Sequence, residues 1–116
     1  MITDGPNVLL VRHTYGRRCW DLPGGKVERG EEPVTAGRRE MLEELGLDIS
    51  SWRWIAKLEV VADHRHDTLT CFHAEVAAPE LTVELAEIAQ TGWFQRFELP
   101  ADLSPHAAVI IELLAA

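Results

Sequence analysis

The sequence predicts one α/β domain, residues 1–116, in which helices pack on a β-sheet. Two observations support this prediction. Strand-like segments alternate with two helix-like segments in an irregular order, which is typical of an α/β sandwich. The 116 residues are also enough for one hydrophobic core and too few for two independent ones.

The strand-like segments are short apolar or β-branched runs between turn residues. A buried strand is expected after the turn at Asp4-Gly5-Pro6. Two longer segments are expected to form a hairpin joined at residues 64–67. A short strand should contain Trp93 and Phe94. The four predicted strands are 7–12, 52–63, 68–76 and 92–95.

The first helix is predicted over residues 33–45. Pro33 suits the first helical position, and Gly46 suits the left-handed residue just past the end. On a helical wheel, Val34, Met41 and Leu45 share the face that we expect to meet the core. A second helix, 106–114, is expected to follow Ser104-Pro105.

Charge and composition exclude several classes of protein. The net charge of −8 argues against nonspecific binding to a nucleic-acid backbone, which needs a basic surface. No apolar run approaches the roughly 20 residues of a membrane-spanning helix, and no signal peptide is visible. Cys19 and Cys71 form neither a CxxC pair nor a disulfide framework, which indicates a reducing compartment. We therefore expect a cytoplasmic protein.

Three glutamates gather on the first helix beside its predicted core face. At about 100° per residue, Glu40, Glu43 and Glu44 fall within an arc of roughly 100°. Like charges at these spacings cost an isolated helix roughly 0.2–0.5 kcal/mol per pair. The helix alone allows two interpretations: a solvated acidic face, or a site for a hard cation such as Mg²⁺.

The surrounding sequence favours the second interpretation. From Gly25 to Leu47 the chain resembles the Nudix box, which is G, five residues, E, seven residues, then R-E-U-x-E-E-x-G-U with U bulky and apolar. The flanking W-x-L-P-G-G, Trp20 to Gly25, is also typical of the family. Every fixed position is filled, by Gly25, Glu31, Arg39, Glu40, Met41, Glu43, Glu44, Gly46 and Leu47.

The resemblance implies a Nudix-type α/β/α sandwich with a mixed sheet. It also implies that Mg²⁺, or Mn²⁺ in its place, is held by the Gly24 carbonyl and by the carboxylates of Glu40, Glu43 and Glu44. Glu40 is our first choice for the general base. Glu87, in a loop before the Trp93 strand, is either a further ligand or base, or an exposed loop acid. Four residues would support the site without touching substrate: Gly25, Glu31, Arg39 and Gly46.

The implied activity is Mg²⁺-dependent hydrolysis of a phosphoanhydride bond by water attack on phosphorus. The expected substrate is a nucleoside di- or triphosphate or a close derivative, because family markers for ADP-ribose, dinucleoside polyphosphates and coenzyme A are missing from residues 12–22 and 62–65. Candidate substrate contacts are Arg12, Tyr15, Arg17, Arg18 and Lys26. Two alternatives stay open: a catalytically silent ligand-binding module, and an RNA 5′-end pyrophosphohydrolase.

The first strand of the implied fold is expected to be truncated. The segment 8–12 should pair across the Asp4-Gly5 turn with an upstream strand, but only Met1, Ile2 and Thr3 precede that turn. Either Met1 is not the true start, or a partner chain supplements this strand at an exposed edge of a homodimer.

Overall fold

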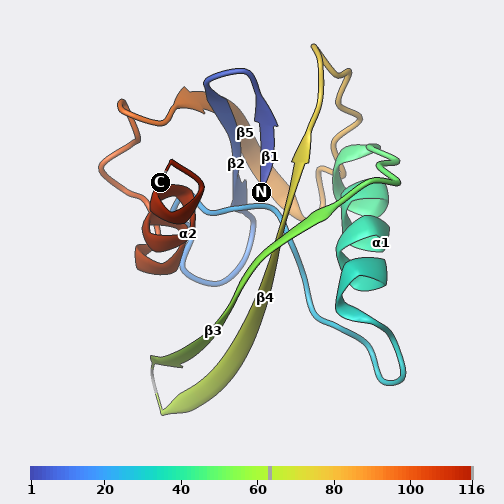
Figure 1. Cartoon of the computed structure of the whole chain (residues 1–116), viewed down its shortest axis with the longest axis vertical. Helices are drawn as coiled ribbons and strands as arrows, with labels where there is room; N and C mark the ends of the chain where they lie inside the picture. The colour runs from blue at the N-terminus through green and yellow to red at the C-terminus, as the bar shows by residue number, and fades with distance from the viewer. Residues whose placement is uncertain (63, 116) are drawn as a thin grey trace.

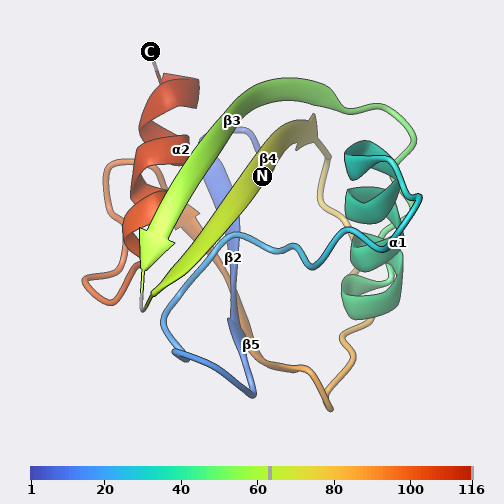
Figure 2. The ribbon, with the colours of Figure 1, turned by 90° about the horizontal axis from the view of Figure 1, so that it is seen from below.

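A computed structural model describes residues 1–62 and 64–115. It forms three layers, with a twisted five-stranded sheet between two helices (Figure 1). Figure 2, seen from below, shows the two helices on opposite faces of the sheet. In chain order the elements are β1 (Ile2–Asp4), β2 (Asn7–His13), α1 (Pro33–Leu45), β3 (Arg53–Ala62), β4 (Arg65–Glu75), β5 (Ile88–Gln95) and α2 (Pro105–Ala115). The predicted mixed α/β sandwich is confirmed.

The three-residue β1 lies in the middle of the sheet, whose strand order is β3-β4-β1-β2-β5. Thr3 pairs antiparallel with Val8 of β2 and parallel with Glu75 of β4, while the other neighbouring strands are antiparallel. Both edges of β1 are therefore used within the chain. The expectation that a partner chain supplements this strand at an exposed edge is wrong, because the sheet's outer edges belong to β3 and β5.

Two hydrophobic clusters, one on each face of the sheet, hold the layers together. Alternation along β2 sends Leu9 and Val11 towards α1, and Val8 and Leu10 towards α2. The cluster beneath α1 consists of Ile2, Leu9, Val11, Met41, Leu45, Leu47 and Ile88. The cluster beneath α2 consists of Met1, Val8, Leu10, Trp20, Ile110 and Ile111. Within the described ranges, no helix is long and apolar enough to cross a membrane.

Two strands begin earlier than the sequence pattern indicated. β4 starts at Arg65, which pairs with Ala62 of β3, so the strand begins inside the predicted turn of residues 64–67. Asp63 lies outside the described residues. β5 starts at Ile88, which pairs with His13 of β2. The extra residues of β4, 65–67, are polar and exposed, whereas β5 gains the buried Ile88 followed by Ala89 and Gln90, which are exposed. In both places backbone pairing extends beyond the apolar pattern that marks a strand in sequence.

Helix α1 has the predicted bounds. Gly46 ends it in the left-handed conformation (φ 68°), and its N–H donates to Leu42 O. The predicted core face is only partly correct. Met41 and Leu45 are buried, but Val34 in the first turn is 38% exposed, whereas the carboxylate-bearing Glu44 is only 2% exposed. The buried face of α1 therefore includes one of the three glutamates instead of lying beside all of them.

A polar junction fixes the start of α2 against the loop that follows Trp20. Ser104 Oγ accepts a hydrogen bond from Ala107 N (3.3 Å) as a helix cap and donates one to Asp21 Oδ1 (2.9 Å). His106 Nε2 lies 3.4 Å from Asp21 Oδ2. The neighbouring carboxylate raises the pKa of His106, although partial burial opposes this effect.

This junction should make stability depend on pH. Because the folded pKa of His106 is raised, its contribution is full below the unfolded value of about 6.5 and is lost as pH rises through the folded pKa. Solvent screens the pair, so we expect a loss of under about 1 kcal/mol. Denaturant unfolding between pH 5 and 9 should show this decline in the parent chain and a flatter profile in His106→Gln. Identical slopes in both proteins would contradict the assignment.

Candidate metal centre

Three carboxylates from distant parts of the chain meet at one end of α1. Glu40 and Glu44 lie one turn apart on the helix, and Glu87 comes from the loop that leads into β5. One oxygen from each residue lies within 4.8 Å of the others. We call these three residues the carboxylate cluster. In residues 1–62 and 64–115, this is the one group of three or more acidic, His or Cys side chains close enough to share a metal ion.

Backbone hydrogen bonds hold the Glu87 loop against both α1 and β2. Glu84 N donates to Glu44 O (2.8 Å), which fixes the start of the loop to the helix. Thr14 N donates to Glu87 O (2.9 Å), and Thr14 Oγ1 donates to Ala86 O (2.8 Å). Glu87 therefore reaches the helix glutamates because its backbone is fixed on two sides.

Burial and mutual repulsion make the charged form of the carboxylate cluster unfavourable. Glu44 is 2% exposed, and its Oε2 is buried without a hydrogen-bond partner among the described residues. Burial and the charge of Glu44 raise the pKa of Glu40, although Arg39 opposes this shift. An unpaired buried carboxylate is costly. A divalent cation would remove that cost, and hard cations such as Mg²⁺ prefer carboxylate oxygens. The residues therefore fit such an ion.

The His13 side chain lies beside the carboxylate cluster. Its Nε2 lies 3.7 Å from Glu44 Oε1 and, like Glu44 Oε2, is buried without a hydrogen-bond partner in the described part of the chain. The neighbouring Glu44 carboxylate raises the pKa of His13, while partial burial opposes the shift. The pairing of β2 with β5 shifts register between Arg12 and His13. The next residue, Thr14, forms the hydrogen bonds to the Glu87 loop.

The glycine turn before α1 approaches Glu40 closely. A Cβ on Gly25 would lie 2.3 Å from the Glu40 carboxyl carbon, whereas a Cβ on Gly24 would have nothing within 4 Å. Only the absence of a side chain at Gly25 therefore leaves room for the Glu40 carboxylate in its position. Gly24, whose carbonyl the sequence suggested as a ligand, is the adjoining residue of the same turn.

Arg39 connects this turn to the helix. Its guanidinium binds Glu31 in a two-pronged arrangement, with Nε to Oε2 at 2.9 Å and Nη2 to Oε1 at 3.0 Å, and also donates to Lys26 O (3.1 Å). Its Nη1 donates to Glu40 (3.0 Å) and to Glu43 (3.3 Å). Glu43 is 59% exposed and lies outside the carboxylate cluster, on the solvent side of the arginine.

Replacing Arg39 should loosen the site without unfolding the protein. Lysine keeps the positive charge but cannot form the two parallel bonds to Glu31. We expect Arg39→Lys to weaken Mg²⁺ binding by about 10- to 100-fold, as loss of a ligand-orienting partner typically does. Calorimetric Mg²⁺ titration of both proteins measures this effect. Arg38→Lys is the matched control, because Arg38 pairs with the exposed Asp48. Equal affinity in all three proteins would contradict the role of Arg39.

The proposed substrate contacts are divided between two regions. Tyr15 lies near the cluster: its ring centroid is 5.0 Å from that of His13, and partial burial together with the charges of Glu44, Glu87 and Glu40 raises its pKa. Arg12 instead faces α2, with its guanidinium 4.9 Å from the Trp20 ring centroid and 3.2 Å from Asp102.

The remaining basic candidates lie in the loops on either side of Trp20. Arg17 contributes to the electrostatic environment of His106, on the α2 side of the sheet. Arg18 has a positive φ of 47°, and both Arg18 and Lys26 are exposed. The structure therefore brings Tyr15 to the carboxylate cluster and places Arg12 and Arg17 near α2.

Sequence reasoning did not identify His13 or Thr14. Both lie at the end of a predicted strand, and neither belongs to the motif that pointed to the helix. The sequence did contain one signal. After four buried apolar residues, β2 ends in two polar residues, and the site lies at this end of the strand. Such positions are common places for functional groups.

Comparisons with known proteins agree with this geometry. The family model for the NUDIX domain matches residues 1–114. An ADP-ribose pyrophosphatase from Mycobacterium tuberculosis is 36% identical over 94 residues, 77% of this chain and 45% of the relative. An NAD-capped RNA hydrolase, NudC, from Stutzerimonas stutzeri is 32% identical over 102 residues, 87% of this chain and 36% of the relative. The chain thus spans less than half the length of these curated relatives.

Solved structures give the same result. The crystal structure of a MutT NUDIX hydrolase from Burkholderia pseudomallei superposes with a TM-score of 0.88 at 27% identity, over 97% of this chain and 92% of that one. A UDP-X diphosphatase structure superposes with a TM-score of 0.81 at 28% identity, over 98% of this chain and 57% of that one. Sequence and fold together show that the chain belongs to the Nudix family.

Proposed function

We propose that this protein is a Mg²⁺-dependent pyrophosphohydrolase that cleaves a phosphoanhydride bond in a nucleoside di- or triphosphate or a related derivative. The observation that carries the proposal is the carboxylate cluster, whose three oxygens converge within 4.8 Å although Glu87 is far from Glu40 and Glu44 in sequence. Glu44 is buried with an unpartnered oxygen, which is unfavourable unless a cation binds there.

Glu40, Glu44 and Glu87 would hold the ion, with the exposed Glu43 and the Gly24 carbonyl as further ligands at the rim. When bound, Mg²⁺ neutralises phosphate charge and makes water a stronger nucleophile. The water oxygen forms a bond to phosphorus, the phosphoanhydride P–O bond breaks, and the departing phosphate leaves as an anion.

A carboxylate of the chain must accept the proton of that water. We assign this role to Glu40, the carboxylate of the cluster that the glycine turn approaches. Arg39 and the close packing of Gly25 hold Glu40 in place. Arg39 would act as a positioning residue, since its bonds run to Glu31, Glu40 and the loop backbone.

Substrate contacts are proposed for the loops that border this site. Lys26 follows the glycine turn, and Tyr15 lies beside His13, so phosphate oxygens and a nucleobase could be bound by these two residues. Arg18 offers a further exposed cation in the same loop region, and Arg12 and Arg17 offer others on the α2 side.

ADP-ribose is a second candidate substrate. The observation that favours it is the 36% identity to the Mycobacterium tuberculosis ADP-ribose pyrophosphatase. A capped RNA end is a third, through the likeness to NudC, although the net charge of −8 opposes binding to a long polyanion. Each of these molecules contains the same type of bond, so the proposed chemistry is shared.

A hydrolysis screen tests the proposal. The panel contains common and oxidised nucleoside triphosphates, nucleoside diphosphates, nucleotide sugars, ADP-ribose, dinucleoside polyphosphates and 5′-triphosphorylated RNA, each with Mg²⁺ and with EDTA. We expect Mg²⁺-dependent release of phosphate, pyrophosphate or a nucleoside monophosphate. A specificity constant for ADP-ribose about tenfold above every nucleoside triphosphate would overturn the substrate assignment. Absence of turnover on the whole panel, with ligand binding retained, would indicate a silent binding module.

A further inference from the structure

Helix α2 is apolar on nearly all sides, although only one side faces the sheet. Ala107, Ile110 and Ile111 are buried against the sheet. On the outward side, Val109 and Leu113 are each 47% exposed. Glu112 is the one charged residue in the helix sequence PHAAVIIELLA apart from a titratable histidine. A helix that is apolar all round is normally covered all round.

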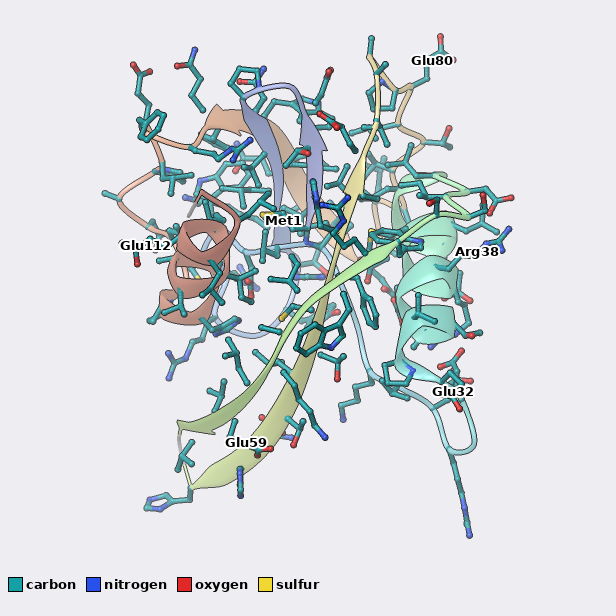
Figure 3. The ribbon with its side chains drawn as sticks, viewed as in Figure 1. Met1, Glu32, Arg38, Glu59, Glu80 and Glu112 are labelled. Atoms are coloured by element: carbon teal, nitrogen blue, oxygen red, sulfur yellow. The ribbon has the colours of Figure 1, made fainter. Side chains whose placement is uncertain are left out.

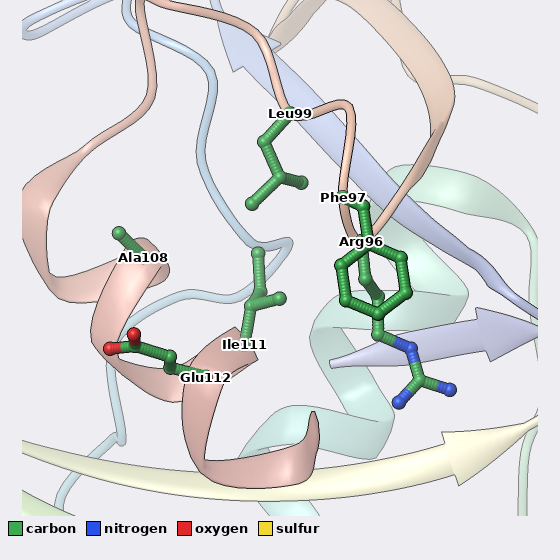
Figure 4. A pocket seen from close by; sticks show the side chains of 6 residues that line it. All are labelled: Arg96, Phe97, Leu99, Ala108, Ile111 and Glu112. Carbon is green, nitrogen blue, oxygen red and sulfur yellow. The ribbon is translucent and has the colours of Figure 1, made fainter. Parts of the chain in front are cut away.

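A groove of about 370 Å³ runs beside this helix (Figure 4). Its wall includes the apolar side chains of Leu99 and Ile111. Phe97 lies at its edge and is 93% exposed, in the turn between β5 and α2. A large exposed aromatic ring next to an apolar groove is the usual mark of a protein-binding surface. The lining residues are Arg96, Phe97, Leu99, Ala108, Ile111 and Glu112.

Two opposite charges flank the groove. Arg96 and Glu112 lie on opposite sides of it, with the apolar side chains between them (Figure 4). In the described part of the chain, neither forms an ion pair. A twofold axis through the middle of the groove would bring each side of it onto the opposite side of a second copy. Arg96 would then meet the partner's Glu112, and Glu112 would meet the partner's Arg96, so the surface is complementary to itself.

We propose that two copies of this chain associate through this face, with Phe97 of each protomer seated in the groove of the other. The outward side chains of α2 extend the apolar contact, and the two charge pairs set its register. Because α2 and α1 lie on opposite faces of the sheet, the carboxylate clusters stay outside the interface (Figure 2). The proposal is independent of the reaction catalysed.

The contact is small. An 11-residue helix is only about 16 Å long. We therefore expect the helix and the adjoining turn to bury less surface than the roughly 800 Å² per partner of a standard specific interface. We therefore expect a reversible dimer with a dissociation constant in the micromolar range.

Charge exchange gives a sharp test. Arg96→Glu and Glu112→Arg each place like charges opposite one another in a homodimer, so each variant alone should dissociate. A mixture of the two variants restores opposite charges at both pairs and should form a heterodimer. Sedimentation velocity from about 10 to about 500 μM covers the expected range. Phe97→Ser should also weaken association, and thermal melts check that all variants are folded.

We expect a dimer for the parent chain and for the mixture, and at least a tenfold weaker dimer for each single variant. A parent chain that remains monomeric at about 500 μM would overturn the proposal. So would folded single variants that dimerise as well as the parent, or a mixture no better associated than its components. Because only a contact between two chains gains from mixing, an ion pair within one chain cannot produce the expected result.

Discussion

Glu44→Gln should abolish nearly all hydrolysis while leaving the fold intact. Glu44 is the most buried of the clustered carboxylates, and one of its oxygens has no partner in the described structure. Glutamine keeps the shape but removes the charge that a cation needs. We expect kcat/KM at limiting Mg²⁺ to fall about 10³-fold, equivalent to roughly 4 kcal/mol of transition-state stabilisation.

The same substitution should not destabilise the metal-free protein. It removes a buried charge and its repulsion with Glu40, so the melting temperature without Mg²⁺ should stay the same or rise. The parent should gain thermal stability on adding Mg²⁺, and the variant should lose that gain. Glu80→Gln, at an exposed loop acid outside the carboxylate cluster, is the control (Figure 3). Full activity of Glu44→Gln at limiting Mg²⁺ would disprove the metal assignment.

Glu43→Gln separates two possible roles of the exposed glutamate. The sequence motif implies that Glu43 is a ligand, and on that basis its substitution should also reduce turnover by orders of magnitude. In the structure its carboxylate contacts Arg39 and is mostly solvent-exposed. We expect its effect to be largest at limiting Mg²⁺ and to diminish as Mg²⁺ is raised, because an exposed ligand contributes mainly to affinity.

The helix and its acids could be predicted because their signals are local. Pro33, Gly46 and the glutamate spacing act within a few residues of one another, so bounds and register follow from the sequence. The burial of Glu44 could not be predicted in this way. Glu44 is buried because the loop that contains Glu84, which is distant from α1 in sequence, packs against the end of the helix.

The parts that depend on tertiary pairing were less predictable. The start of β5 at Ile88 and the interior position of β1 depend on which strands lie side by side, and a single sequence does not record this. The position of the Arg12 side chain also depends on tertiary structure. Its charge suggested phosphate binding, but strand alternation turns it towards Trp20 and Asp102, on the opposite face from His13.

Gly25→Ala should inactivate the protein without unfolding it. The added methyl group would lie 2.3 Å from the carboxyl carbon of Glu40, a distance that no real contact tolerates. The end of a flexible side chain can move aside at little cost, so the fold should survive while Glu40 leaves its position. Displacement by about 1 Å at a reacting centre can cost about 10²-fold in rate. We expect a loss of that size in kcat, with the circular dichroism spectrum and melting temperature close to those of the parent.

Gly24→Ala is the matched control for this experiment. It adds the same methyl group one residue earlier, where nothing lies within 4 Å, and it keeps the backbone carbonyl. Neither glycine has a positive φ, so alanine fits both backbones. In Gly24→Ala, stiffening of the unfolded chain should raise stability by about 0.4–1 kcal/mol. Gly24→Ala should therefore retain activity within about threefold, while Gly25→Ala loses it. Equal activity in the two variants would show that the contact between Gly25 and Glu40 does not position the carboxylate.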